Sequence, residues 1–278
     1  MKVAYKRIID FKLIVLCSYL FTMSVTANQS VSDIETKPVF GQYRQGSVVV
    51  LQLPIQAKLA INGQSVSVSS SGTAIFGIAR DAKSVDVFLS VGAKQWRWQE
   101  DVLARHYDIQ RIDGLPESKV NPDPKIQAEI QQNNADIAAA RKQEGVSVIP
   151  DLPFELPISG RVSGVYGSQR ILNGTPKQPH LGVDIAATEG TPILAPADGV
   201  VILAHPNMVL TGQTLMLDHG AGIKSIYIHM SATSVRLGDH VVRGQQIGAV
   251  GKTGRATGPH LHWGISWYGV QIDPVTPV

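Results

Sequence analysis

The strongest constraint on the fold is the sequence pattern of the second half of the chain, where short apolar runs alternate with glycines. Residues 151–278 hold 18 of the 26 glycines. The apolar runs have the length of β-strands, and glycine supplies the tight turns that join such strands. No stretch of this half shows convincing helical periodicity. The pattern predicts a compact all-β domain. Its clearest strand candidates are residues 192–195, 200–203, 214–217 and 225–229.

A second strand-rich region precedes it, over residues 39–112. Asn62-Gly63 is a hairpin signal, because both residues tolerate the positive φ that a tight hairpin turn requires. We therefore expect a small antiparallel β domain of unknown role. Trp96 and Trp98 share one strand face, which is more typical of a core than of a sugar-stacking platform. The strand candidates are residues 48–53, 65–69, 85–89 and 95–99.

Residues 113–157 are predicted to form a linker with one helix. Asp123 can cap the helix, Pro124 suits its first position, and Gly145 stops it. The apolar stripe of this helix is thin, so we expect it to lie on a surface or to space the two domains. The fold class predicted is thus mainly β, with a small N-terminal β domain joined to the C-terminal domain by a helix-containing linker. The stripe is Ile126, Ile130 and Ile137, and the basic last turn is Arg141 and Lys142.

The first 27 residues resemble a secretory signal peptide. A basic start is followed by an apolar core and ends in small residues at Ala27. A retained membrane anchor is the alternative, but the apolar run is short of the ~20 residues that a spanning helix needs. Lipidation of Cys17, the only cysteine, is less favoured because Leu16 precedes it. The mature chain is expected to be exported, without disulfides, a thiol nucleophile or a thiolate metal site.

The charge of the chain argues against nucleic acid as a partner. The formal net charge is +3, but the first 27 residues hold four basic side chains and one acidic side chain. The other 251 residues hold 21 basic and 21 acidic side chains. Nothing after the leader supplies the excess positive charge that binding to a phosphate backbone needs.

Histidines in three short motifs carry the predicted chemistry. A continuous strand would place His180 and Asp184 about 13 Å apart, so a turn at Gly182 is needed to bring them together. His260 and His262 alternate on a strand and face the same side, about 7 Å apart. Two histidines and one carboxylate are three ligands that leave a fourth tetrahedral position open, the pattern of a catalytic zinc site. The third motif is His229 at the end of an apolar run.

The remaining histidines are interpreted as surface residues rather than ligands. Two lie in predicted turns, one precedes a proline, and one belongs to the N-terminal region. They are His219, His240, His205 and His106.

These motifs resemble the lysostaphin-type zinc endopeptidases, which cleave peptidoglycan cross-bridges. The resemblance covers roughly residues 155–275 and implies a duplicated, barrel-sandwich type of antiparallel β domain over residues 158–278. It also implies that His180, Asp184 and His262 bind Zn²⁺. The catalytic pair that it implies is His229 and His260.

The function expected is that of an exported, periplasmic or envelope-associated zinc metalloendopeptidase acting on peptide cross-links of peptidoglycan. A non-enzymatic regulator of another wall hydrolase is the alternative, which the complete set of five residues disfavours. A biotinyl or lipoyl carrier is a third interpretation, suggested by residues 195–201 and 238–244. The intervening segment offers only Lys224 for attachment, and a carrier would not explain the histidines. Cell-envelope or divisome proteins are possible partners of the N-terminal domain.

Overall fold

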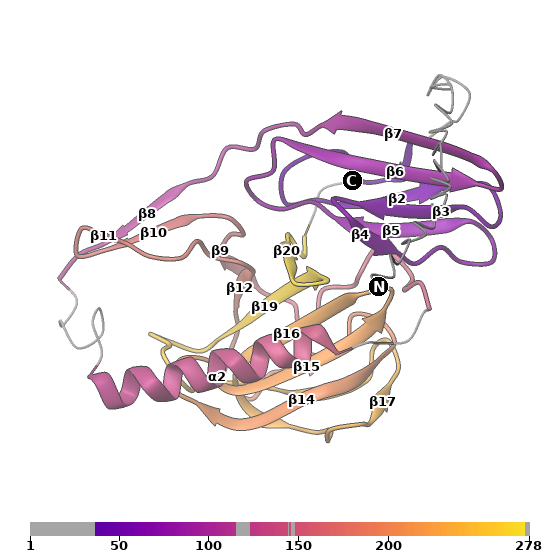
Figure 1. Ribbon diagram of the computed structural model, residues 1–278. Helices are drawn as coiled ribbons and strands as arrows, with labels where there is room; N and C mark the ends of the chain where they lie inside the picture. Colours follow the sequence, from indigo (N-terminus) through magenta and orange to yellow (C-terminus); the bar gives the residue numbers. More distant parts are fainter. Residues whose placement is uncertain (1–36, 115–122, 144, 146–147, 276–278) are drawn as a thin grey trace, which may run out of the picture.

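The computed structural model describes residues 37–114, 123–143, 145 and 148–275, and its regular secondary structure is mainly β-strand (Figure 1). The expected leader over residues 1–27 lies outside the described residues. Among the described residues, no helix combines the length and the apolar character needed to cross a membrane. The mainly β fold class predicted from the sequence is confirmed.

The N-terminal unit consists of two antiparallel sheets that contribute to one core. The hairpin predicted at Asn62-Gly63 is present, and both residues have positive φ (49° and 79°). Trp96 is buried and Trp98 is half-buried, which confirms their interpretation as core-facing residues. One sheet has the order β1 (Pro38–Phe40), β2 (Val48–Gln52) and β5 (Thr73–Gly77); the other has the order β4 (Gln64–Val66), β3 (Lys58–Ile61), β6 (Ser84–Val91) and β7 (Lys94–Asp101).

The C-terminal unit is a sheet of ten strands in which all pairings are antiparallel, as the alternation of apolar runs and glycines predicted. Seven strands follow one path: β17 (His240–Val241), β14 (Gly199–Met208), β15 (Gly212–Gly220), β16 (Ile223–Thr233), β19 (His260–Trp267), β12 (Val183–Ala186) and β9 (Arg161–Gly164). Three more pair beside it: β13 (Pro192–Leu194), β18 (Gln246–Val250) and β20 (Val270–Ile272).

A separate three-stranded sheet connects the two halves of the chain. β8 (Ile109–Ile112) pairs in parallel with β10 (Gln169–Leu172), which pairs with β11 (Thr175–Pro176). The segment expected to close the N-terminal unit, up to residue 112, is therefore hydrogen-bonded to the C-terminal half instead. A parallel pairing between segments 60 residues apart leaves no local sequence signal.

The two β units share a continuous hydrophobic core. Phe76 of β5 contacts Trp267 of β19 edge-on, with 6.2 Å between ring centroids. At the margin of this contact, Arg105 forms a 2.7 Å ion pair with Asp273, whose backbone N–H donates to the Gly46 carbonyl. Apolar burial combined with a half-buried ion pair fixes one unit against the other.

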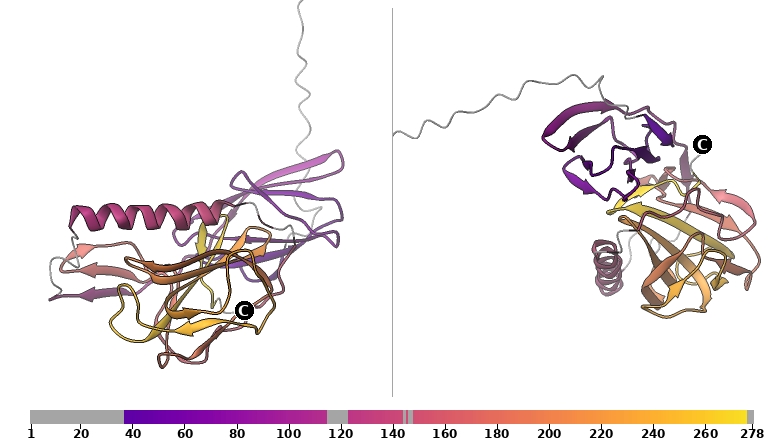
Figure 2. Two further views of the ribbon diagram at one scale, coloured as in Figure 1. Left: turned by 90° about the horizontal axis from the view of Figure 1, so that it is seen from below. Right: turned by 90° about the vertical axis from the view of Figure 1, so that its right-hand side faces the viewer.

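The single helix of the described residues, α2 (Pro124–Lys142), docks on the C-terminal sheet (Figure 2). The side chain of Asp123 caps it by accepting a hydrogen bond from the Lys125 backbone N–H at 2.9 Å, as predicted. Near its end, Lys224 donates to the Gln143 carbonyl. The buried face of the helix and the strand residues it contacts form a small cluster: Ile137, Ala140, Ile202, Met208, Met216 and Ile226.

The interpretation of His219 as a surface residue is wrong. The ring is 3% exposed at the end of β15, where its Nδ1–H donates to the Asp198 carbonyl at 2.7 Å and its Nε2 lies 2.7 Å from Ser225 Oγ. Burial lowers the pKa of His219, so the ring is held neutral. The turn signal of the sequence did not reveal this, because the partners come from other strands. His106 and His240 are exposed and His205 is half-buried.

Truncation of the buried helix residue tests the docking of α2. Ile137→Ala removes apolar volume from the cluster and is expected to cost about 2 to 4 kcal/mol. Ile126→Ala on the same helix should cost less than about 0.5 kcal/mol, because Ile126 is 45% exposed. Hydrogen exchange of the helix amides measures both effects, and equal protection in the two variants would contradict the docking.

The buried neutral state of His219 predicts a pH-dependent stability. Since its pKa is lower in the folded state than the unfolded value of about 6.5, its contribution is complete above that pH. The contribution is lost as the pH falls, with a slope that approaches about 1.4 kcal/mol per pH unit. We expect a smaller loss of stability between pH 7.5 and pH 5 in His219→Gln than in the parent chain. Denaturant unfolding at each pH measures the difference, and parallel curves would refute the assignment.

Candidate metal centre and active site

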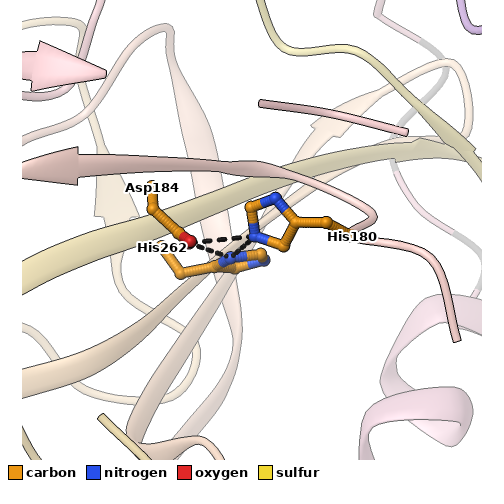
Figure 3. Close-up of side chains that lie close together, drawn as sticks. All are labelled: His180, Asp184 and His262. Atoms are coloured by element: carbon orange, nitrogen blue, oxygen red, sulfur yellow. Dashed lines mark hydrogen bonds and ion pairs between the residues drawn. The ribbon is translucent and has the colours of Figure 1, made fainter. Parts of the chain in front are cut away.

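Three side chains that are separated by up to 82 residues converge on one point: His180, Asp184 and His262 (Figure 3). Asp184 Oδ1 lies 3.0 Å from His180 Nε2 and 2.7 Å from His262 Nδ1. The two ring nitrogens are 2.8 Å apart. The three residues proposed as ligands from the sequence are thus together, each presenting one donor atom to the same small space.

The sheet brings two of these residues together by register. β12 and β19 are adjacent antiparallel strands, and Asp184 stands directly opposite His262. His180 precedes β12, and the chain turns between it and Asp184 at Gly182, as the four-residue spacing required. A side chain at Gly182 would have no room, because its Cβ would lie 2.7 Å from His262 Nε2.

The donor set suits a cation. The Nδ1 of His180 lies 3.0 Å from the Val165 carbonyl, which can only accept, so this nitrogen carries the ring proton. In the neutral ring, Nε2 is then an acceptor that faces the carboxylate and the second imidazole. Acceptors this close repel one another unless a positive charge lies between them. A metal ion bound by two imidazoles and one carboxylate removes this repulsion.

The carboxylate of Asp184 is kept ionised. Burial alone would raise its pKa, but contacts with His180 and His262 hold the pKa well below its usual range, because each ring, when protonated, donates a hydrogen bond and adds positive charge. Its second oxygen, Oδ2, forms a 3.2 Å ion pair with Arg170 Nη2. Sequence reasoning missed Arg170, since one arginine in a short polar run carries no signal of its own.

His229 and His260 form a second pair of rings beside this cluster, with 4.8 Å between their centroids. His260 Nε2 lies 3.9 Å from Asp184 Oδ1. Each ring binds a backbone carbonyl through Nδ1: His229 at 2.8 Å from Thr253 and His260 at 2.8 Å from Gly258. Each neutral ring therefore carries its proton on Nδ1 and has a free electron pair on Nε2.

The backbone of His229 is in an uncommon conformation. Its φ is +63°, in the left-handed region that is uncommon for residues other than glycine, although His, Asn and Asp adopt it more often than the rest. The pairing of β15 with β16 shifts here: Leu215 pairs with Tyr227 but Gln213 pairs with Met230, so β16 has one extra residue. Such a bulge re-aims a side chain relative to regular alternation. Strain of this kind persists where the surrounding structure fixes it, typically at functional sites.

His229 is neutral near pH 7. Its pKa is lowered to about 4, chiefly by burial and in addition by the neighbouring His260 and His262, against the opposing effects of the Thr253 carbonyl and of Asp184. A neutral, buried imidazole with a free Nε2 has the form that accepts a proton.

Comparison with known proteins agrees with this geometry. Residues 178–274 match the model of Peptidase family M23. Residues 178–274 are an M23 peptidase domain. This confirms the resemblance to lysostaphin-type enzymes. A solved structure assigned to peptidase M23 from Pseudomonas aeruginosa is 29% identical to this chain, with a TM-score of 0.60. The match covers 84% of this chain and 94% of the chain in that structure.

Curated relatives match less than half of this chain. A protein of Haemophilus influenzae described as an uncharacterized metalloprotease is 36% identical over 124 residues, which are 44% of this chain and 26% of that protein. The peptidoglycan DD-endopeptidase ShyA of Vibrio cholerae is 39% identical over 104 residues, 37% of this chain and 24% of ShyA. This chain thus spans about a quarter of the length of these relatives.

The close approach of β9 to Asp184 gives a test of the metal centre. A Cβ at Gly164 would lie 2.3 Å from Asp184 Oδ2, so Gly164→Ala must displace the carboxylate. We expect divalent-metal binding to weaken by about 10-fold or more, while the fold persists. Gly258→Ala is the control, because a Cβ there meets no atom within 4 Å. Zn²⁺ competition against a chromophoric chelator measures both, and unchanged binding in Gly164→Ala would exclude this placement of Asp184.

Proposed function

We propose that the protein is an exported zinc metalloendopeptidase that hydrolyses peptide cross-links of peptidoglycan. The observation that carries the proposal is the convergence of His180, Asp184 and His262 beside the His229–His260 pair. This arrangement supports a three-ligand metal set and two proton-handling imidazoles in one site, in a chain whose residues 178–274 match the M23 peptidase family.

His180, through Nε2, Asp184, through Oδ1, and His262, through Nδ1, would hold the Zn²⁺ ion. Bound zinc supplies a Lewis acid that polarises a carbonyl and lowers the pKa of water. Asp184 offsets half of the charge of the ion. Val165 holds the ring of His180 in the required tautomer by accepting its Nδ1–H, a contact that fixes the direction of the ligand.

The two remaining histidines handle protons at Nε2. The carbonyls of Thr253 and Gly258 fix both rings with Nδ1 protonated, so each Nε2 can accept a proton from an attacking water. Once protonated at Nε2, the same ring can donate to the departing amine. The other ring can stabilise the oxyanion that develops on the peptide carbonyl when its own Nε2 carries a proton, because only an N–H donor is attracted to that oxygen. Either His229 or His260 can be the base.

The substrate class is supported by the relatives. One is named a peptidoglycan DD-endopeptidase, and another is named a DD-carboxypeptidase/endopeptidase. Both names favour a cross-link between D-amino-acid residues over a glycine bridge. Such a substrate lies outside the cytoplasmic membrane, in line with the signal peptide expected over residues 1–27. Docking of cell-envelope or divisome proteins through the N-terminal unit stays a prediction.

Digestion of purified peptidoglycan tests the function. The chain from residue 28 onward should convert cross-linked dimers into monomers, and a zinc chelator should abolish the conversion because it removes the Lewis acid. Mass spectrometry of the fragments identifies the bond cut. Intact dimers in a sample shown to contain zinc would overturn the enzymatic proposal and favour the role of a non-enzymatic regulator.

Two classes of variants separate metal binding from proton transfer. His180→Ala and His262→Ala should lose both zinc and activity. His229→Ala should keep zinc and lose activity by about 100-fold or more. The metal content of each purified variant is measured directly, with thermal unfolding as the folding control. Loss of zinc from a folded His229→Ala protein would contradict this division of roles.

A further inference from the structure

The two oxygens of Asp184 have different partners. Oδ1 faces His180 Nε2 and His262 Nδ1, at 3.0 and 2.7 Å. Oδ2 points away from these rings toward Arg170 Nη2, at 3.2 Å. The side chain of Asp184 is 14% exposed and that of Arg170 is 31% exposed, so the ion pair is partly shielded from water.

Arg170 is in turn held by a residue from the first half of the chain. Its Nε–H donates to Gln110 Oε1 at 3.3 Å. The parallel pairing of β8 with β10 places Gln110 directly opposite Arg170. A continuous chain of contacts therefore leads from Gln110 through Arg170 to Asp184. Both Gln110 and Arg170 lie outside residues 178–274, which match the M23 family.

We propose that Arg170 is a positioning residue that restricts Asp184 to binding the metal through Oδ1 alone, and that Gln110 holds Arg170 in place. The inference rests on the metal centre of the proposed function. A carboxylate can bind a metal through one oxygen or through both. Because a guanidinium N–H occupies Oδ2, only Oδ1 is available, and one coordination position stays open for the substrate.

The steric surroundings agree with this role. Gly164 of β9 stands opposite Asp184 and leaves space for Oδ2 only because it has no side chain. The backbone of β9 therefore leaves space for the Asp184 carboxylate without binding it, and Arg170 fixes its orientation. The charge of Arg170 also partly offsets that of Asp184, so removing the arginine changes both the direction of the ligand and the net charge around it.

Metal binding by Arg170→Ala and Arg170→Lys tests the inference. Zn²⁺ affinity by chelator competition is expected to fall about 10- to 100-fold in Arg170→Ala, and Arg170→Lys should recover part of the loss. The visible spectrum of the Co²⁺-loaded protein should report a higher coordination number in Arg170→Ala, since Oδ2 becomes free to bind. Arg111→Ala, on the same strand as Gln110, is the matched control and should resemble the parent chain.

The outcomes separate the two proposals. If the parent chain binds neither Zn²⁺ nor Co²⁺, the proposed metal centre fails. If the parent chain binds metal and folded Arg170→Ala has the same affinity and the same Co²⁺ spectrum, only the role of Arg170 fails.

A double-mutant cycle tests Gln110. Gln110→Ala should change Zn²⁺ affinity by a few-fold in the parent chain, in the same direction as Arg170→Ala, and should have no effect in the Arg170→Ala background. Equal effects in both backgrounds would show that Gln110 does not act through Arg170.

Discussion

The pairing of Asp184 with His262 across two neighbouring strands is the constraint on which the rest of the site depends. Opposite residues of an antiparallel pair are held within a few ångströms by backbone hydrogen bonds. This register places a carboxylate and an imidazole together before any metal binds. His180 needs only one turn to reach them, and the lack of side chains at Gly182 and Gly164 leaves the required space. A site built on strands is held more rigidly than one built on loops.

The two proposed proton-handling histidines are positioned differently. His260 belongs to the same strand as His262 and shares its face through simple alternation. His229 comes from β16, where an extra residue and a positive φ turn its ring out of the regular pattern. Regular strand geometry thus positions Asp184, His260 and His262, whereas a local irregularity positions His229. The large buried core around β15, β16 and β19 supplies the packing that holds such strain in place.

The segments before the M23 domain are integrated with it through three separate contacts. The N-terminal unit shares a hydrophobic core with β19 and β20, the helix α2 covers part of the face of β14, and β8 extends a small sheet beside the metal centre. The last contact reaches Asp184 through Arg170 and Gln110. The segments outside the peptidase domain therefore fold together with it as one body. The solved M23 structure that covers 84% of this chain includes segments beyond the family match, which supports the same view.

Local sequence patterns predicted much of the secondary structure and of the candidate site. Alternation and glycine turns predicted both β units, Asp123 and Pro124 predicted the start of the helix, and His180, Asp184, His229, His260 and His262 were selected by spacing and by family resemblance. Contacts between distant segments decided the rest. His219 is buried because Asp198 and Ser225 from other strands satisfy its ring. Gln110 meets Arg170 only through a parallel pairing across 60 residues. Sequence determines which residues can form a strand, a turn or a ligand, because those properties depend on neighbours in the chain. Only the tertiary structure decides what each side chain faces, because burial and charge depend on neighbours in space.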